Sequence, residues 1–184
     1  MPTHEGSSVG YPRVVDGDET RWLEPDELET WLAYVATTTL LEGVLDRQLQ
    51  READMPLAYY LILAMLSDAP DRSLRMSELA AATQSSQSRL SHAVARLERA
   101  GWVRRTPCSE DRRSTFAQLT EEGFAALGAA APGHVRAVRQ HLFDRLTSEQ
   151  VGQLGEICRA VLDGMDADPR TALPPPLAGR HPSA

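Results

Sequence analysis

Four consecutive segments between Ser77 and Leu119 constrain the fold more than any other part of the sequence. They read SELAAAT, then SQSRLSHAVARLERAG after a polar turn at Gln84-Ser85-Ser86, then WVRRT and TFAQL. The first two segments have the length and apolar spacing of short helices, and Ser77 is expected to cap the first of them. The last two segments alternate like the strands of a hairpin. The sequence therefore predicts a helix-turn-helix followed by a β-hairpin.

The second of these helices has two different faces. One face is apolar and is expected to pack on the core, with Leu90, Ala93, Val94 and Leu97. The other side presents Ser86, Ser88, Arg89, His92, Arg96 and Arg99, and Gly101 supplies the C-terminal stop. A DNA major groove, about 12 Å wide, accepts a helix with short polar side chains and longer basic ones that reach phosphates. We therefore expect these residues to contact DNA, with His92 either in the groove or simply exposed.

The hairpin loop, residues 108–114, carries Asp111, Arg112 and Arg113 at its tip. A hairpin tip is narrow enough to approach a minor groove, where the negative potential favours an inserted arginine. Asp111 is expected to orient the guanidinium of Arg113 rather than contact DNA itself. Arg104 and Arg105 alternate along a strand, so at most one of them faces phosphate and the other pairs with an acid.

Charge is unevenly distributed along the chain. The net charge is −7, yet the stretch from Arg72 to Arg113 has nine arginines against four acidic residues, which gives +5. Phosphate attraction is local, because salt screens it beyond roughly 8 to 10 Å. A basic stretch in an acidic protein is thus compatible with a nucleic-acid surface.

The flanking segments predict helices at about 25–52, 57–66, from Thr120 to about His141 or Leu146, and from a capping box at Thr147 to about Met165. We expect residues 1–24 to form a mobile arm and residues 166–184 to form a disordered, Pro-rich tail. The long first helix and the last pair carry apolar stripes that a single small winged helix cannot cover. A homodimer would cover them.

The stretch SELAAATQSSQSRLSHAVARLERAGWVRRTPCSEDRRSTFAQLTEEG resembles the MarR-type (multiple antibiotic resistance regulator) family of transcriptional regulators. The resemblance rests on the order of the elements, on D-x-R at Asp111 to Arg113, and on Leu119-Thr120 followed by Gly123. It implies a mostly α (α+β) winged helix-turn-helix over residues 25–165, with a DNA-binding lobe at 57–119 and dimerisation helices at 25–52 and 120–165. It also implies a homodimer that binds double-stranded DNA at a pseudo-palindromic operator and represses transcription until a small ligand or oxidant acts.

Four aromatic residues, Trp31, Tyr34, Tyr59 and Tyr60, either line a pocket for a small aromatic or phenolic effector or pack in the core and interface. Cys108 is either a redox switch or an inert thiol, and Cys158 is expected in a core. His134 and His141 lie seven residues apart, but no carboxylates that would complete a zinc site are evident. We therefore expect no metal and no cofactor.

Catalysis finds no support in the sequence. The segment GSSVG matches the G-x-S-x-G nucleophile pattern, but that motif requires a preceding buried strand, and only five residues come before it. No apolar run approaches the roughly 20 residues that span a bilayer, and no signal peptide is recognisable, so we expect a cytoplasmic protein. The alternatives to a specific repressor are a non-specific architectural DNA-binding protein, a redox-responsive regulator and a ligand carrier that has lost DNA binding.

Overall fold

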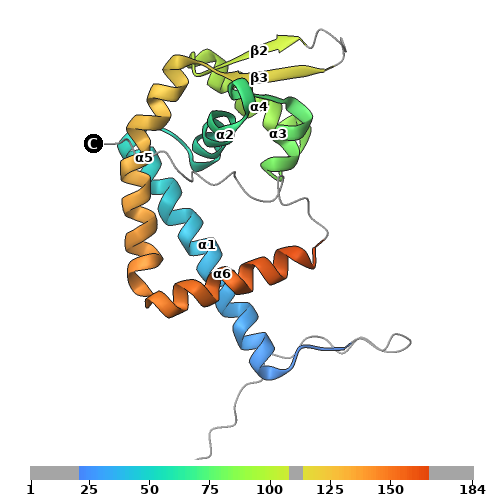
Figure 1. Cartoon of the computed structure of the whole chain (residues 1–184), viewed down its shortest axis with the longest axis vertical. Helices are drawn as coiled ribbons and strands as arrows, with labels where there is room; N and C mark the ends of the chain where they lie inside the picture. The colour runs from blue at the N-terminus through green and yellow to red at the C-terminus, as the bar shows by residue number, and fades with distance from the viewer. Residues whose placement is uncertain (1–20, 108–113, 166–184) are drawn as a thin grey trace, which may run out of the picture. The chain divides into compact units, whose positions relative to one another are not determined.

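A computed structural model describes residues 21–107 and 114–165, which are mostly helical with one small sheet (Figure 1). The helices are α1 (Pro25–Ala53), α2 (Leu57–Asp68), α3 (Met76–Ala82), α4 (Gln87–Arg99), α5 (Glu121–His141) and α6 (Ser148–Asp163). The strands are β1 (Ser73–Arg75), β2 (Val103–Pro107) and β3 (Thr115–Leu119), and short 3₁₀ turns occupy Pro70–Arg72 and Phe143–Arg145. The predicted fold class, a mostly α winged helix-turn-helix, is confirmed.

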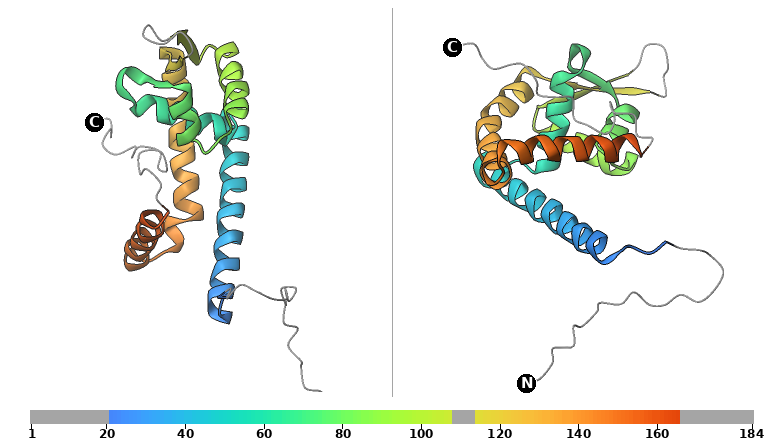
Figure 2. Two further views of the ribbon diagram at one scale, coloured as in Figure 1. Left: turned by 90° about the vertical axis from the view of Figure 1, so that its right-hand side faces the viewer. Right: turned by 60° about the horizontal axis from the view of Figure 1, so that its bottom comes forward.

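Helix α1 is a single continuous helix (Figure 2), although it belongs to two compact units that divide between Ala36 and Thr37. Pro25 begins the helix, and Asp26 and Glu27 lie in its first turn, where the helix dipole favours negative charge. Within the first unit the rings of Trp31 and Tyr34 stack with centroids 6.1 Å apart.

The core of the second unit forms around α2. This helix is apolar nearly all round, and Tyr60, Leu63 and Leu66 are at most 1% exposed. The predicted apolar face of α4 packs into the same core, because Leu90, Val94 and Leu97 are also at most 1% exposed. Helix α5 joins the core through Leu127 and Ala130. Burial of large apolar side chains at about 1.5–3 kcal/mol each makes this cluster the main source of stability.

The turn between α3 and α4 is held by its own backbone. Gln84 adopts a left-handed conformation with φ of 49°, and the Ser85 N–H donates to the Ala80 carbonyl at 3.0 Å. The predicted cap at Ser77 is wrong: α3 begins at Met76, and the Glu78 carboxylate accepts the Arg75 N–H at 3.0 Å. The cause is β1, which holds Arg75 extended and so starts the helix earlier.

The hairpin has a third strand that the sequence did not reveal. Strand β3 is central, in the order β1-β3-β2, and Leu74 pairs with Ala117 across the added antiparallel edge. A three-residue strand is too short to show alternation, which explains the omission. The alternation expected of the hairpin is observed, since Val103, Ala117 and Leu119 are buried.

Two expectations for the end of the chain have different outcomes. The capping box at Thr147 and Gln150 is confirmed, with the Thr147 N–H donating to Gln150 Oε1 at 2.9 Å. Cys158 was expected in a core, but its side chain is exposed because no residue of α6 is buried within the chain.

The hairpin and α5 meet at a closely packed junction. Gly101 ends α4 with φ of 76°, and the Thr120 hydroxyl donates to the Gly101 carbonyl at 2.7 Å while accepting the Gly123 N–H at 3.0 Å. The Thr120 N–H donates to the Trp102 carbonyl at 3.0 Å. A Cβ at Gly123 would lie 2.1 Å from the Trp102 carbonyl oxygen. Only glycine therefore allows this approach of α5 to the start of β2.

Replacing Gly123 with alanine should destabilise the protein by about 1–3 kcal/mol, because the backbone of Trp102 must move. Gly128→Ala is the matched control, since a Cβ there meets no atom within 4 Å and alanine favours a helix by about 1 kcal/mol. Urea denaturation of both variants measures the two effects. Equal stability of the two variants would show that the junction does not require glycine.

Candidate nucleic-acid interface

The outward face of α4 carries several exposed basic side chains. Ser88, Arg89, His92, Arg96 and Arg99 are exposed, as the sequence predicts. Ser86 lies at the N-cap, where its hydroxyl accepts the Arg89 N–H at 3.3 Å. Among the described residues Arg89 and Arg96 form no ion pair, so their guanidinium groups are available to an external anion.

Arg105 fastens β2 to α4. Its guanidinium donates to the Ser91 carbonyl at 2.7 Å and lies 3.4 Å from the Glu98 carboxylate. Its backbone N–H donates to the other oxygen of the same carboxylate at 2.9 Å. The neighbouring Arg104 is exposed and donates to Gln118 at 3.0 Å. The predicted ion pair of one of these two arginines with an acid is observed at Arg105, and a phosphate contact of the exposed Arg104 stays a prediction.

Two further arginines of the basic stretch support the fold. The guanidinium of Arg72 lies 2.9 Å from Glu121 and 4.0 Å above the ring of Phe124. The guanidinium of Arg75 lies 5.3 Å from the ring centroid of Phe116. These contacts join the 3₁₀ turn and β1 to α5 and β3. The basic stretch therefore combines arginines that position the hairpin with arginines that α4 leaves exposed.

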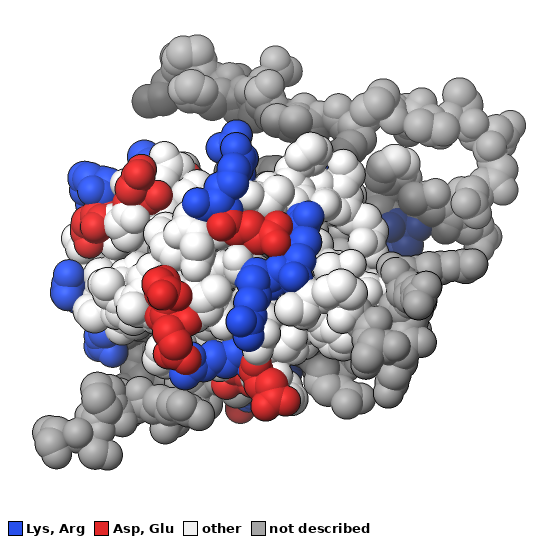
Figure 3. Space-filling model, turned by 90° about the horizontal axis from the view of Figure 1, so that it is seen from above, with Lys and Arg blue, Asp and Glu red and all other residues white. Residues whose placement is uncertain are grey.

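The face seen from above in Figure 3 carries arginines beside carboxylates rather than a uniformly basic surface. The loop residues predicted to enter a minor groove, Asp111, Arg112 and Arg113, lie outside the described residues, as does Cys108. The strands that lead into and out of that loop are paired through Pro107 and Thr115. The structure thus describes the base of the hairpin.

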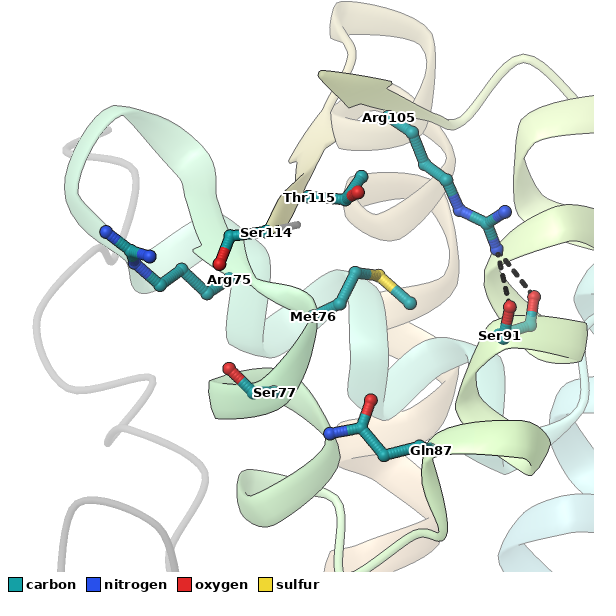
Figure 4. A pocket seen from close by; sticks show the side chains of 8 residues that line it. All are labelled: Arg75, Met76, Ser77, Gln87, Ser91, Arg105, Ser114 and Thr115. Atoms are coloured by element: carbon teal, nitrogen blue, oxygen red, sulfur yellow. Dashed lines mark hydrogen bonds between the residues drawn. The ribbon is translucent and has the colours of Figure 1, made fainter. Parts of the chain in front are cut away.

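A polar cavity of about 340 Å³ lies between α3, α4 and the hairpin (Figure 4). Its lining includes Arg75, Ser77, Gln87, Ser91 and Arg105, and the hydrogen bonds from Arg105 to Ser91 form one side of it. No sequence pattern indicates this cavity, because its walls come from segments that only the tertiary fold brings together.

The four predicted effector residues divide between the two units. Trp31 and Tyr34 belong to the first unit, with side chains 49% and 58% exposed, whereas Tyr59 and Tyr60 belong to the second. Tyr60 is buried, and its ring centroid lies 4.4 Å from that of His134 on α5. Burial raises the pKa of the Tyr60 phenol and lowers the pKa of the His134 imidazole. Core packing is thus the observed role of Tyr60, and its place in a pocket remains a prediction.

The described residues contain neither a candidate metal site nor a candidate membrane-spanning helix. No group of three or more His, Cys, Asp or Glu side chains in residues 21–107 and 114–165 has a geometry suited to a metal ion. Within the same ranges, no helix has both the length and the apolar character needed to span a membrane. The GSSVG segment lies outside the described residues.

Comparison with known proteins identifies relatives along most of the chain. The sequence model of the MarR family matches residues 53–114. A MarR family transcriptional regulator from Streptomyces coelicolor, solved in complex with DNA, is 55% identical, with a TM-score of 0.77 over 83% of this chain and 95% of that chain. AbsC, a MarR family transcriptional regulator from the same organism, is 38% identical, with a TM-score of 0.73 over 79% of this chain and 98% of that chain.

A curated relative is more distant. The transcriptional repressor MprA of Escherichia coli K12 is 31% identical over 107 residues, which are 58% of this chain and 60% of the repressor. The match therefore spans less than two thirds of that repressor's length.

Stability should depend on pH through His134. Its pKa is below the ordinary 6.5 in the folded chain because burial penalises the imidazolium, so the unfolded chain takes up a proton first as pH falls. The neutral His134 side chain therefore contributes to the free energy of unfolding above about pH 6.5, and this contribution is lost as the pH falls through the pKa of the folded chain. Free energies of unfolding at several pH values should therefore fall more steeply on acidification for the wild type than for His134→Gln. Parallel profiles would contradict this assignment.

Proposed function

The chain belongs to the MarR family of transcriptional regulators, and on that premise we propose that it is a sequence-specific DNA-binding repressor of the cytoplasm. The observation that carries the proposal is the exposed face of α4, where Arg89 and Arg96 form no ion pair with any residue of 21–107 and 114–165. The S. coelicolor relative that was solved with DNA supports the same reading.

The chemistry of α4 suits a duplex. Short side chains at the start of the helix, such as Ser88, fit against base edges in a major groove, while Arg89 and Arg96 reach phosphates on either side. His92 lies one turn after Ser88 on the same face, where it offers a donor or acceptor to a base. The Arg105 contacts to α4 keep the hairpin at a fixed orientation, so that the loop beyond Pro107 and before Thr115 can reach the adjacent minor groove.

We propose that the protein binds DNA as a homodimer. Within single units, large apolar side chains remain exposed, including Leu32 and Leu40 on α1 and Ile157 and Val161 on α6, with exposed fractions of 50–68%. Apolar surface of this kind marks an interaction site rather than a solvent face. A two-fold dimer would present two copies of α4 to half-sites about one helical turn apart, which fits a pseudo-palindromic operator.

We propose that the binding of a small effector releases the protein from DNA. The support is the presence of two cavities large enough for a small molecule. Trp31, Tyr34, Tyr59 and Tyr60, which the sequence predicts for an aromatic or phenolic ligand, line neither of these two cavities, so their role is a proposal from the sequence. The competing function is non-specific architectural DNA binding, which the same exposed arginines would serve. Sequence preference separates the two, because phosphate contacts alone carry no sequence information.

Arg96→Ala should weaken binding to the operator by about 1–3 kcal/mol if the side chain makes a well-formed contact. Fluorescence anisotropy would compare DNA from upstream of the gene with a shuffled duplex at several salt concentrations. The wild type should prefer the native fragment, and its affinity should fall steeply with salt. Arg113→Ala tests the loop in the same assay.

The matched control is Arg139→Ala, which removes an exposed arginine from α5 rather than from α4. It should leave DNA affinity within error of the wild type. Equal affinity of the wild type for both duplexes would favour the architectural function, and undiminished binding by Arg96→Ala and Arg113→Ala would remove the proposed interface.

Ile157→Glu should raise the dissociation constant of the dimer at least about tenfold, because burying an unpaired carboxylate costs several kcal/mol. Arg159→Glu is the control, since it places the same side chain half a turn away on α6. Sedimentation equilibrium measures both. If the Ile157 variant dimerises like the wild type, the apolar face of α6 is not the interface.

A further inference from the structure

Glu98 is the only acidic residue of α4, a helix that the structure describes in full. It lies beside the outward line of Ser88, His92 and Arg99. A carboxylate on a helix that approaches a duplex is repelled by the phosphates, because like charges raise the free energy of the complex. Charge alone would therefore favour a neutral residue at position 98.

The contacts of Glu98 lead to the hairpin. One oxygen of its carboxylate accepts the backbone N–H of Arg105 on β2 at 2.9 Å, and the other oxygen lies 3.4 Å from Arg105 Nε. The carboxylate thus holds the backbone of the strand as well as the guanidinium group. Both side chains are only 30% exposed, so water screens their attraction less than it screens a fully exposed pair. Among the described residues this is the only ion pair between α4 and the hairpin.

The same arginine contacts α4 at a second point. Arg105 Nη2 donates to the Ser91 carbonyl oxygen at 2.7 Å and to the Ser91 hydroxyl at 3.3 Å (Figure 4). Ser91 and Glu98 are seven residues apart, which is about two helical turns, so they lie on the same side of α4. A strand that is attached to a helix at two points cannot pivot about either of them. These contacts therefore fix the angle between α4 and the hairpin.

We propose that Glu98 is a positioning residue that determines operator specificity through Arg105, an inference that rests on the proposed function. With α4 in a major groove and the hairpin at the adjacent minor groove, both sets of contacts form together only at one angle between the two elements. An angle that is fixed before binding avoids the free-energy cost of ordering the hairpin.

Non-specific binding has a different requirement. It depends on phosphate contacts, which carry no sequence information and follow the net charge of the surface. The negative charge of Glu98 therefore lowers the affinity for DNA in general, while its contacts with Arg105 raise the affinity for the operator. The two effects have opposite signs, so an experiment can separate them.

The test measures, by fluorescence anisotropy, the affinity of the full-length protein for a duplex that the wild type selects from a random library and for a shuffled duplex. Glu98→Gln keeps an oxygen that can accept the Arg105 N–H but loses the charge that attracts the guanidinium group. Its affinity for the selected duplex should fall about fivefold or more, as expected for loss of a charged pair. Its affinity for the shuffled duplex should stay the same or rise, because a negative charge has been removed.

A second variant separates geometry from charge. Glu98→Asp keeps the carboxylate but is one methylene shorter, so it cannot hold both groups of Arg105 at the same distances. It should lose affinity for the selected duplex without gaining affinity for the shuffled one. Glu122→Gln is the matched control, because it makes the same substitution at an exposed residue of α5 outside these contacts. It should leave the ratio of the two affinities unchanged.

Two results for Glu98→Gln would overturn the proposal: binding of the selected duplex as tight as that of the wild type, or an equal loss of affinity for both duplexes. The second result would indicate a general structural role. If Glu98→Gln does not fold by circular dichroism, Glu98→Asp decides the outcome, and full preference for the selected duplex would then overturn the proposal. A wild type that selects no sequence would contradict the proposed function itself, and this inference with it.

Discussion

The close approach of α5 to the Trp102 carbonyl is the constraint on which the DNA-binding half of the structure depends. It requires glycine at position 123, and it uses Thr120 both as the cap of α5 and as a hydrogen-bond donor to Gly101. Because Gly101 ends α4 and Trp102 leads into β2, this junction relates a helix, a hairpin and a second helix to one another. The arrangement of the helix-turn-helix and the hairpin follows from a few backbone contacts rather than from a large interface.

The arginines of the basic stretch fall into two groups: some contact other residues of the fold, and others are exposed on α4. Arg72, Arg75 and Arg105 have carboxylate, carbonyl or aromatic partners, and they tie the edges of the sheet to α4 and α5. Arg89 and Arg96 have no ion-pair partner among the described residues. A guanidinium group is always charged, and other arginines of the chain, such as Arg72 and Arg105, form ion pairs with acidic residues. The availability of Arg89 and Arg96 is the strongest structural support for an external polyanion.

The two cavities differ in what surrounds them. The cavity beside α4 is formed by the hairpin and the helix-turn-helix, and one of its two arginines, Arg105, already contacts Ser91 and Glu98. The cavity between α1 and α5 is lined by residues that include Arg51 and Glu52, and the Glu52 carboxylate accepts hydrogen bonds from Gln48 and Arg51. The aromatic residues that the sequence predicts for an effector line neither of these two cavities.

The sequence by itself determined the helices, the faces of α4, the ends of the hairpin and the caps at Thr120 and Thr147, because these depend on apolar periodicity and on side chains that bond to nearby backbone. It also separated Arg104 from Arg105, since strand alternation is local. Only the tertiary structure decided the third strand, the partners of Arg72 and Arg105, and the burial of Gln48, because each depends on segments distant in the chain. Cys158 illustrates the same dependence on distant segments. The apolar stripe of α6 predicts a buried side chain, but a helix face is buried only where another element covers it, and Cys158 is exposed within the chain.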